Sequence, residues 1–301
     1  MWSSCVKKPN IGITVVDPAG IGPEIAMKAA ADPRVREVCL PSLYGPHTAA
    51  EIARYRLGQV SAEAGRAAYD AIVRAVADAQ AGTIDAIATA PVNKEALALA
   101  GLPWKGHTDL LAHLTGSARV AMMFYSEELR VVLATIHVPL AEVPRMLTRE
   151  LVDGIVELTA TAMPRFGYPR PRLALAGLNP HAGEHGVIGK EDEAVLRPAV
   201  ASARERGIDI TGPWPGDTVF GRAVRGEFDA VIACYHDQGL IPVKLLAFGH
   251  AVNVTLGLPI VRTSVDHGTA FDIAGKGIAD ESSLVDAIRL AAKLAADSRA
   301  A

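Results

Sequence analysis

The sequence is poor in the residues that mark secreted and nucleic-acid-binding proteins. Its 301 residues include only three cysteines, Cys5, Cys39 and Cys234. They are too far apart for a CxxC pair, so we expect reduced thiols and a cytoplasmic location. Aromatic residues make up 5% of the chain and the formal net charge is -3. This balance offers no large basic surface, so we expect no nucleic-acid partner.

Long hydrophobic runs are also missing. The N-terminal residues contain no apolar core of the length that a signal peptide needs. No stretch approaches the roughly 20 apolar residues that cross a bilayer. The alanine-rich segment 285–301 is interrupted by Asp, Arg and Lys. We therefore expect a soluble protein that binds no membrane.

The composition is that of a globular enzyme. Hydrophobic residues account for 50% and charged residues for 21% of the chain, which excludes a disordered protein. The length allows two lobes around a cleft. No repeat or linker marks a boundary, so non-contiguous segments can build the lobes.

Strand and helix patterns alternate along the chain. Short β-branched or apolar runs predict strands over 11–16, 84–89, 120–124, 131–136, 173–178, 208–210, 231–234 and 252–256. Apolar residues at helical spacing predict helices over 23–31, 62–81, 149–165, 191–206 and 281–295. This alternation predicts an α/β fold with a mostly parallel sheet and helices on its faces.

A glycine-rich loop, DPAGIGPE (17–24), follows the first predicted strand and opens a helix. Glycines let backbone amides approach a ligand, and a helix N-terminus favours anions. The loop is not a Rossmann fingerprint, because the third glycine of GxGxxG would fall at Ile25. A binding loop and a plain tight turn both fit this pattern.

Three histidines occupy the same position relative to predicted strands. His137, His181 and His236 each come just after a buried run. In open α/β sheets ligands gather at the carboxyl ends of strands, and neutral imidazole is a common metal ligand. Any one of these residues could simply satisfy a loop, but the three together favour a catalytic metal site.

Cationic and small polar side chains suggest an anion site. Lys244, Asn253 and Arg262 surround a glycine-rich stretch, and His107-Thr108 forms a second polar turn. Arginine binds phosphate or carboxylate through two parallel hydrogen bonds. Lys94 follows another predicted strand and could face a cleft. Surface charges and helix N-caps are the alternative explanation for each residue alone.

Together these motifs resemble the 4-hydroxythreonine-4-phosphate dehydrogenase family of vitamin B6 biosynthesis. The matching segments occur in family order and cover nearly the whole chain. They are DPAGIGPE (17–24), TAPVNK (89–94), GHTD (106–109), LATIHVPL (133–140), LNPHAGE (178–184), GDTVF (216–220), YHDQG (235–239) and VNVTLGLPIVRTSVDHGTA (252–270).

The resemblance implies the fold of the isocitrate and isopropylmalate dehydrogenases. This fold has two α/β/α lobes, a mostly parallel sheet and a cleft between the lobes. We expect residues 1–106 and 277–301 to form the first lobe. Residues 107–276 would form the second lobe, with the metal ligands and the interface of a homodimer. NAD, or NADP, would be held without a Rossmann fingerprint, by residues that the motifs do not identify.

The resemblance also implies roles for individual residues. His137, His181 and His236 would bind a divalent metal (Zn, Mg or Co), with His236 supplied by the partner subunit. Lys94 or Asp237 would relay the proton. The implied substrate contacts are His107, Thr108, Lys244, Asn253 and Arg262.

The implied reaction is metal-dependent oxidation and decarboxylation of 4-phosphohydroxy-L-threonine to 3-amino-2-oxopropyl phosphate, with NAD as hydride acceptor. The metal would lower the pKa of the substrate hydroxyl.

Four features depart from the usual family pattern or point to other branches. Val16 stands where relatives carry Gly or another small residue, and the segment 40–60 is short. Asn93 and His185 resemble the branch that oxidises D-threonate or D-erythronate 4-phosphate. A further branch acts on cis-dihydrodiols of aromatic carboxylates such as terephthalate. From other classes, a metal-dependent hydrolase and a non-catalytic binding protein remain open.

Overall fold

The computed structural model describes residues 7–300, with only the backbone for 298–300, so Cys5 lies outside the described residues. The chain divides into two compact units. The first unit contains the chain up to Ala118 and again from Val252, and the second is Arg119–Ala251. The predicted second lobe, 107–276, is therefore too long at both ends. Its first residues form a helix that packs in the first unit, and its last ones form strands of that unit's sheet.

The sheet of the first unit has five strands in the order β2-β1-β3-β10-β9. Four of them are parallel, and β9 is antiparallel to β10. The strands are β1 (Asn10–Thr14), β2 (Leu40–Tyr44), β3 (Ala86–Thr89), β9 (Val252–Leu256) and β10 (Val261–Ser264). The short 40–60 segment thus still supplies the edge strand β2.

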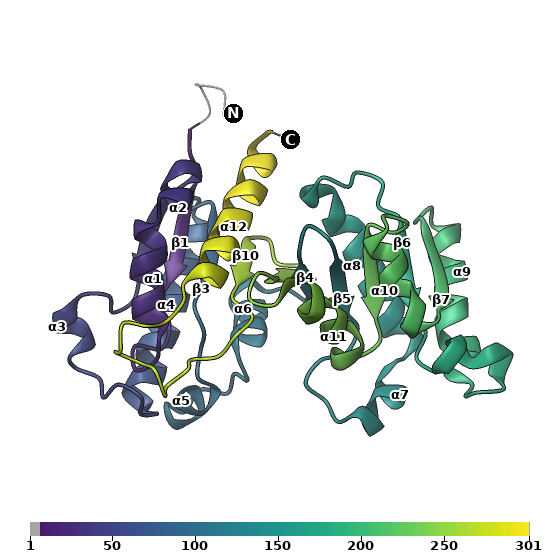
Figure 1. The fold of residues 1–301 in the computed structure, drawn as a ribbon, viewed down its shortest axis with the longest axis horizontal. Coiled ribbons are helices and arrows are strands. Elements are labelled where there is room, and N and C mark those ends of the chain that lie inside the picture. Colours follow the sequence, from purple (N-terminus) through teal and green to yellow (C-terminus); the bar gives the residue numbers. More distant parts are fainter. Residues whose placement is uncertain (1–6, 301) are drawn as a thin grey trace. The chain divides into compact units, whose positions relative to one another are not determined.

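Seven helices of the first unit are described. They are α1 (Gly22–Ala31), α2 (Pro33–Val38), α3 (Ala49–Ile52), α4 (Ala62–Gln80), α5 (Lys94–Leu99), α6 (His107–Thr115) and α12 (Ser282–Ala300). Helices α1, α2 and α12 pack against one another, and α12 lies along β10 and β3 (Figure 1). Helix α4 packs on β1 and contacts α5 and α6. The helices therefore form layers on the sheet, as the α/β alternation predicts.

The sheet of the second unit runs in the order β4-β5-β8-β6-β7. Strands β4 and β5 form an antiparallel pair, and the other pairs are parallel. The strands are β4 (Ala121–Tyr125), β5 (Arg130–Leu133), β6 (Leu173–Ala176), β7 (Ile210–Trp214) and β8 (Ala230–Ala233). The central strands β8 and β6 are fully buried runs, which is typical of parallel strands covered on both faces.

The helical segments of the second unit alternate with these strands. They are η1 (Leu140–Glu142), α7 (Val143–Met146), α8 (Arg149–Ala162), η2 (Met163–Phe166), η3 (Pro180–Gly186), η4 (Asp192–Leu196), α9 (Arg197–Glu205), α10 (Gly216–Val224) and α11 (His236–Ala247). Helices α8 and α9 pack together, whereas α10 and α11 lie on β8.

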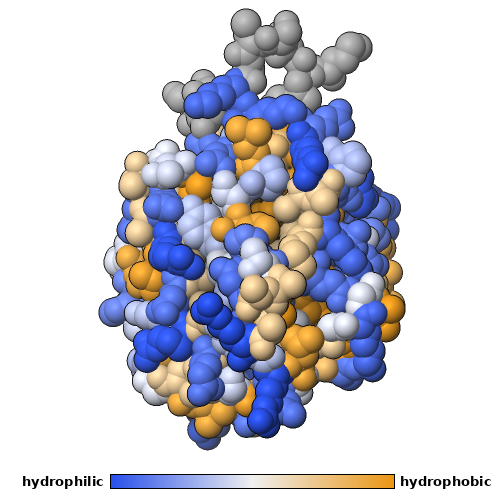
Figure 2. Space-filling view, turned by 90° about the vertical axis from the view of Figure 1, so that its left-hand side faces the viewer, coloured by the Kyte–Doolittle hydropathy of each residue, from blue (hydrophilic) through white to orange (hydrophobic). Residues whose placement is uncertain are grey.

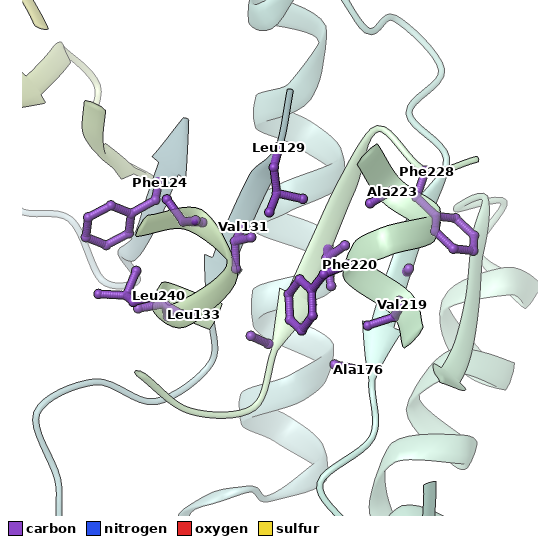
Figure 3. Packing of buried hydrophobic residues seen from close by; sticks show 14 of the residues in the cluster. Phe124, Leu129, Val131, Leu133, Ala176, Val219, Phe220, Ala223, Phe228 and Leu240 are labelled. Atoms are coloured by element: carbon purple, nitrogen blue, oxygen red, sulfur yellow. The ribbon is translucent and has the colours of Figure 1, made fainter. Parts of the chain in front are cut away.

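A hydrophobic cluster holds α10 and α11 on the sheet (Figure 3). Phe220 and Leu240 extend from the two helices toward strand residues such as Val131. Gly239 allows α11 to lie close to β5, since a Cβ there would come within 2.6 Å of Leu133. This close approach fixes the start of α11, where His236 lies.

No helix in residues 7–300 combines the length and the apolar character needed to cross a membrane. The face drawn in Figure 2 mixes hydrophilic and hydrophobic residues in small patches.

Candidate active site

A row of polar residues crosses the sheet of the first unit. Thr14 of β1 pairs in register with Thr89 of β3, and Thr89 pairs with Ser264 of β10. Ser264 in turn pairs with Asn253 of β9. Three of these strands end at this row, so it lies at the sheet edge where α/β proteins bind ligands.

Arg262 lies two residues before Ser264 on the same strand face, and it is a buried cation. Its side chain is 2% exposed. One terminal nitrogen, Nη1, donates to Thr255 Oγ1 at 2.9 Å, and the other, Nη2, donates to Thr89 Oγ1 at 2.7 Å. Its Nε is buried with no hydrogen-bond partner among the described residues. Burial lowers the pKa of Arg262 to about 9, which leaves the guanidinium protonated at neutral pH.

His107 begins α6 close to this guanidinium. Burial, and then the charge of Arg262, hold the pKa of His107 well below its usual value, so its ring is neutral at neutral pH. Its Nε2 and the Asn253 Oδ1 are both buried without a hydrogen-bond partner in the described part of the chain. Buried polar atoms are seldom left unsatisfied, so these atoms point to a polar ligand.

The other predicted residues of the first unit lie beside His107. Thr108 is the next residue in the first turn of α6 and is half-buried. Lys94 is exposed at the start of α5. A Cβ on Gly106 would lie 3.8 Å from Lys94 Cε, so the lysine stem passes next to the turn that precedes His107. Lys94, His107 and Thr108 are therefore neighbours.

The glycine-rich loop before α1 packs against its own chain. A Cβ at Gly22 would lie 2.2 Å from Val15 O, and one at Gly20 would lie 2.8 Å from Thr269 O. These contacts explain both glycines without a ligand. Val16, just before this loop, has a φ of 61°. This is a strained value for a β-branched side chain. Asp17 is buried and has an unpartnered Oδ2 within residues 7–300, and burial raises its pKa.

In the second unit, the three histidines follow three neighbouring strands. His137 follows β5, His236 follows β8 and His181 follows β6. The rings of His137 and His236 lie 5.6 Å apart, measured between centroids. The Nδ1 of His236 is 2.7 Å from an oxygen of Asp237. A carboxylate on one ring nitrogen orients the other nitrogen for a metal.

Two of these histidines have strained backbones. His137 has a φ of 46°. His181 begins a run in which five successive residues, 181–185, have φ between 42° and 77°. Left-handed conformations cost about 1–2 kcal/mol for each non-glycine residue, and four of these five are not glycine. Strain of this size persists where the surroundings impose it, which is frequent at functional sites.

Hydrogen bonds join the strand ends from which the three histidines emerge. Thr135, just before His137, donates to Cys234 O at 2.8 Å. Gln238 of α11 accepts from Cys234 N at 2.7 Å through Oε1 and donates to Gly177 O at 2.7 Å through Nε2. These hydrogen bonds thus link the end of β5 to the end of β8, and the end of β8 to the end of β6.

Cys234 itself is buried. Burial raises the pKa of Cys234, so this thiol stays protonated.

Within residues 7–300, no three His, Cys, Asp or Glu side chains gather closely enough to hold a metal ion. His236 lies beside His137 within one chain, and the expectation that a partner subunit supplies His236 to each metal site stays a prediction. Lys244 lies half-buried on α11 in the second unit, whereas Asn253 and Arg262 belong to the first.

The sequence interpretation missed residues that hold the predicted ones. Thr89 and Thr255 position Arg262, and Gln238 joins two histidine loops. Thr89 and Gln238 both lie within motifs quoted for the resemblance, TAPVNK and YHDQG, so a signal for them was present. Thr255 also lies within such a motif, VNVTLGLPIVRTSVDHGTA, but its contact with Arg262 depends on the antiparallel pairing of β9 with β10.

Comparison with known proteins gives consistent matches over most of the chain. Residues 21–291 match the family described as pyridoxal phosphate biosynthetic protein PdxA. A 4-hydroxythreonine-4-phosphate dehydrogenase of Desulforapulum autotrophicum is 45% identical, covering 95% of each chain. A D-threonate 4-phosphate dehydrogenase of Cupriavidus necator is also 45% identical, over 95% of this chain and 97% of that one. The crystal structure of a Klebsiella pneumoniae 4-hydroxythreonine-4-phosphate dehydrogenase superposes with a TM-score of 0.87 at 41% identity, covering 97% and 99% of the two chains.

Proposed function

The chain belongs to the family of the pyridoxal phosphate biosynthetic protein PdxA, and from this premise we propose that it is a dehydrogenase of a small phosphorylated hydroxy acid. The preferred substrate is 4-phosphohydroxy-L-threonine, oxidised and decarboxylated to 3-amino-2-oxopropyl phosphate with NAD as hydride acceptor. D-threonate 4-phosphate is the second candidate, because relatives named for the two activities are equally similar to this chain.

The observation that carries this proposal is the buried guanidinium of Arg262. No ion pair with a carboxylate satisfies it in the described residues, and its direct partners are the hydroxyls of Thr89 and Thr255. A buried charge without a counter-charge is costly. A phosphate or carboxylate of the substrate would neutralise it and accept a hydrogen bond from Nε. His107 and Asn253 would complete the polar contacts, with Thr108 and Lys244 as the further substrate ligands.

The histidines of the second unit have the donor chemistry for a divalent metal such as Zn²⁺, Mg²⁺ or Co²⁺. His137, His236 and His181 would hold it, and Asp237 orients the His236 ring. A bound metal would supply a Lewis acid that stabilises negative charge on the substrate oxygen during oxidation. Because Asp237 is engaged by His236, we assign the proton relay to Lys94, which lies beside the His107 turn.

A homodimer would complete the metal site. No three potential ligands gather closely enough within the described residues of one chain, so we propose that His137 and His181 act together with His236 of the partner subunit. Helix α11, which begins at His236, has an exposed apolar face. Ile241 is 60% exposed, Leu245 81% and the following Phe248 77%. Exposed apolar patches of this kind mark protein interfaces, and we propose that this one contacts the second copy.

Mixed dimers test this arrangement. Co-expressing His181→Ala with His236→Ala subunits should restore about a quarter of wild-type activity, because about half of randomly assembled dimers are mixed and each holds one intact site. Pairing His137→Ala with His181→Ala should restore none, since these two residues act from the same chain. Restoration in the second mixture would show that His137 and His181 act from different subunits, and restoration in neither would exclude a shared site.

A substrate panel tests the reaction. NADH formation should be measured with 4-phosphohydroxy-L-threonine, D-threonate 4-phosphate, D-erythronate 4-phosphate and a terephthalate cis-dihydrodiol. We expect the highest kcat/KM for the first. A preference for the threonate or erythronate compound would keep the reaction class and change the substrate. A preference for the dihydrodiol would overturn phosphate recognition, and hydrolysis without NADH would overturn the enzyme class.

A further inference from the structure

The turn that carries His181 adopts a conformation that its own sequence disfavours. Residues 181–185 are all left-handed, and only Gly183 among them lacks a Cβ. Three backbone bonds close the turn, from Ala182 N to Asn179 O at 3.0 Å, from Val187 N to Glu184 O at 3.2 Å and from Ile188 N to Gly183 O at 3.0 Å. Left-handed stretches of L-residues do not persist unaided. Something outside the turn must therefore hold it.

Asp192 meets the chain where it enters this turn. Its carboxylate is fully buried. Oδ1 accepts from Leu178 N at 2.8 Å, and Oδ2 accepts from Asn179 N at 3.1 Å and Asn179 Nδ2 at 2.9 Å. All three donors lie between the end of β6 and His181. The carboxylate thus fixes the direction in which the chain leaves the strand.

Asp192 also contacts the middle of the turn. A Cβ at Gly183 would lie 3.2 Å from Asp192 Cβ, and a Cβ at Gly177 would lie 2.9 Å from Asp192 Oδ1. The residue begins the π-helical segment η4, a rare conformation that occurs frequently at functional sites. The side chain is therefore enclosed between the end of β6 and the turn.

We propose that Asp192 is a positioning residue that holds the imidazole of His181 in its metal-binding direction. This role rests on the metal site of the proposed function. A buried carboxylate suits the position because three donors converge on it, and an amide in its place would turn an NH₂ group toward an N–H donor. Asp192 acts through His181 and contacts neither metal nor substrate.

The test compares Asp192→Asn with a matched control, Asp229→Asn. Asp229 is also buried and also accepts a hydrogen bond from a backbone N–H, that of Arg172. These two residues lie just before the paired strands β8 and β6, so Asp229 is at the opposite end of β6 from Asp192. Titration of the full-length protein with Co²⁺, followed by its visible absorption, reports the affinity and geometry of histidine coordination. We expect Asp192→Asn to bind Co²⁺ about 10- to 100-fold more weakly and with an altered spectrum, as for other residues that orient metal ligands. Asp229→Asn should keep the wild-type affinity and spectrum.

Two further variants separate the possible failures. If His181→Ala binds Co²⁺ as the wild type does, the proposed metal site is wrong and the role of Asp192 falls with it. If His181→Ala loses the metal while Asp192→Asn retains it, only the positioning role is overturned. If Asp192→Asn does not fold, Asn179→Ala removes one of the three donors and should weaken Co²⁺ binding several-fold. Unchanged binding in a folded Asn179→Ala protein would contradict the proposal.

Discussion

The two units present their candidate site residues in opposite ways. In the first unit the site residues lie on regular elements, Arg262 on β10, Asn253 on β9 and His107 at the start of α6, and each has a buried polar atom without a hydrogen-bond partner among the described residues. In the second unit His137 and His181 lie on exposed turns with strained backbones, whereas His236 begins helix α11. The first unit thus has buried polar atoms that a ligand could satisfy, whereas the second unit has strained backbone at its candidate ligands. The proposed anion pocket would therefore be preformed within one chain, whereas the proposed metal site would need the metal and a second subunit.

The largest effect is expected from removing a histidine of the second unit. His236→Ala should lower kcat by about a thousandfold, since a catalytic metal contributes several kcal/mol of charge stabilisation. Metal content and kcat should fall together, while binding of the phosphorylated substrate to the first unit changes little. His267→Ala is the matched control, because His267 is also an exposed histidine just past a strand, β10. Equal metal loss in both variants would contradict the assignment.

A pH titration of stability addresses the first unit. His107 has a folded-state pKa below its unfolded value of about 6.5, so the unfolded chain binds more protons as the pH falls. The contribution of the neutral His107 to the free energy of unfolding is therefore full above about pH 6.5. Below that pH it decreases, by at most about 1.4 kcal/mol per pH unit.

Urea unfolding of the ligand-free protein between pH 7 and 5 measures this loss. His107→Gln should flatten the pH dependence, whereas His113→Gln, which replaces an exposed histidine on the same helix, should not. The same slope in all three proteins would mean that His107 is not buried as a neutral ring.

The smallest effect concerns the strain of the second unit. His185 is left-handed, with a φ of 56°, and its side chain is 90% exposed. Replacing it with Gly should stabilise the protein by about 1 kcal/mol, because Gly adopts this conformation without steric cost. His185→Ala keeps a Cβ and should give no such gain. A Tm that does not rise for His185→Gly would argue against a strained turn.

The sequence predicted much of this fold because hydrophobic periodicity is local. The strand predicted over 252–256 coincides with β9, and the helix predicted over 62–81 matches α4 within a residue. The strand β10 was missed, since VRTS has few apolar residues and gains its burial only by pairing with β3 and β9. Helix α11 was missed because Gly239 and Pro242 interrupt its pattern, and packing on β5 overrides them.

The site was only partly accessible from the sequence. The positions of His137, His181 and His236 after strands are local features, and the structure places all three there. Which rings meet depends on strand order, which is not local: β5 and β8 are adjacent, so His137 lies beside His236. The roles of Thr255 and Asp192 depend on long-range pairing and on a left-handed turn, neither of which leaves a pattern in the sequence.

The most direct test of the central claim is a comparison of Arg262→Lys with the wild type on two substrates. Lysine keeps the charge but lacks the planar fork of donors. With the phosphorylated hydroxy acid, kcat/KM for NADH formation should fall roughly ten- to a hundredfold, which corresponds to about 1.5–3 kcal/mol. With the same acid lacking phosphate, the two proteins should differ much less. An equal loss on both substrates would contradict the account, because Arg262 would then not recognise the phosphate.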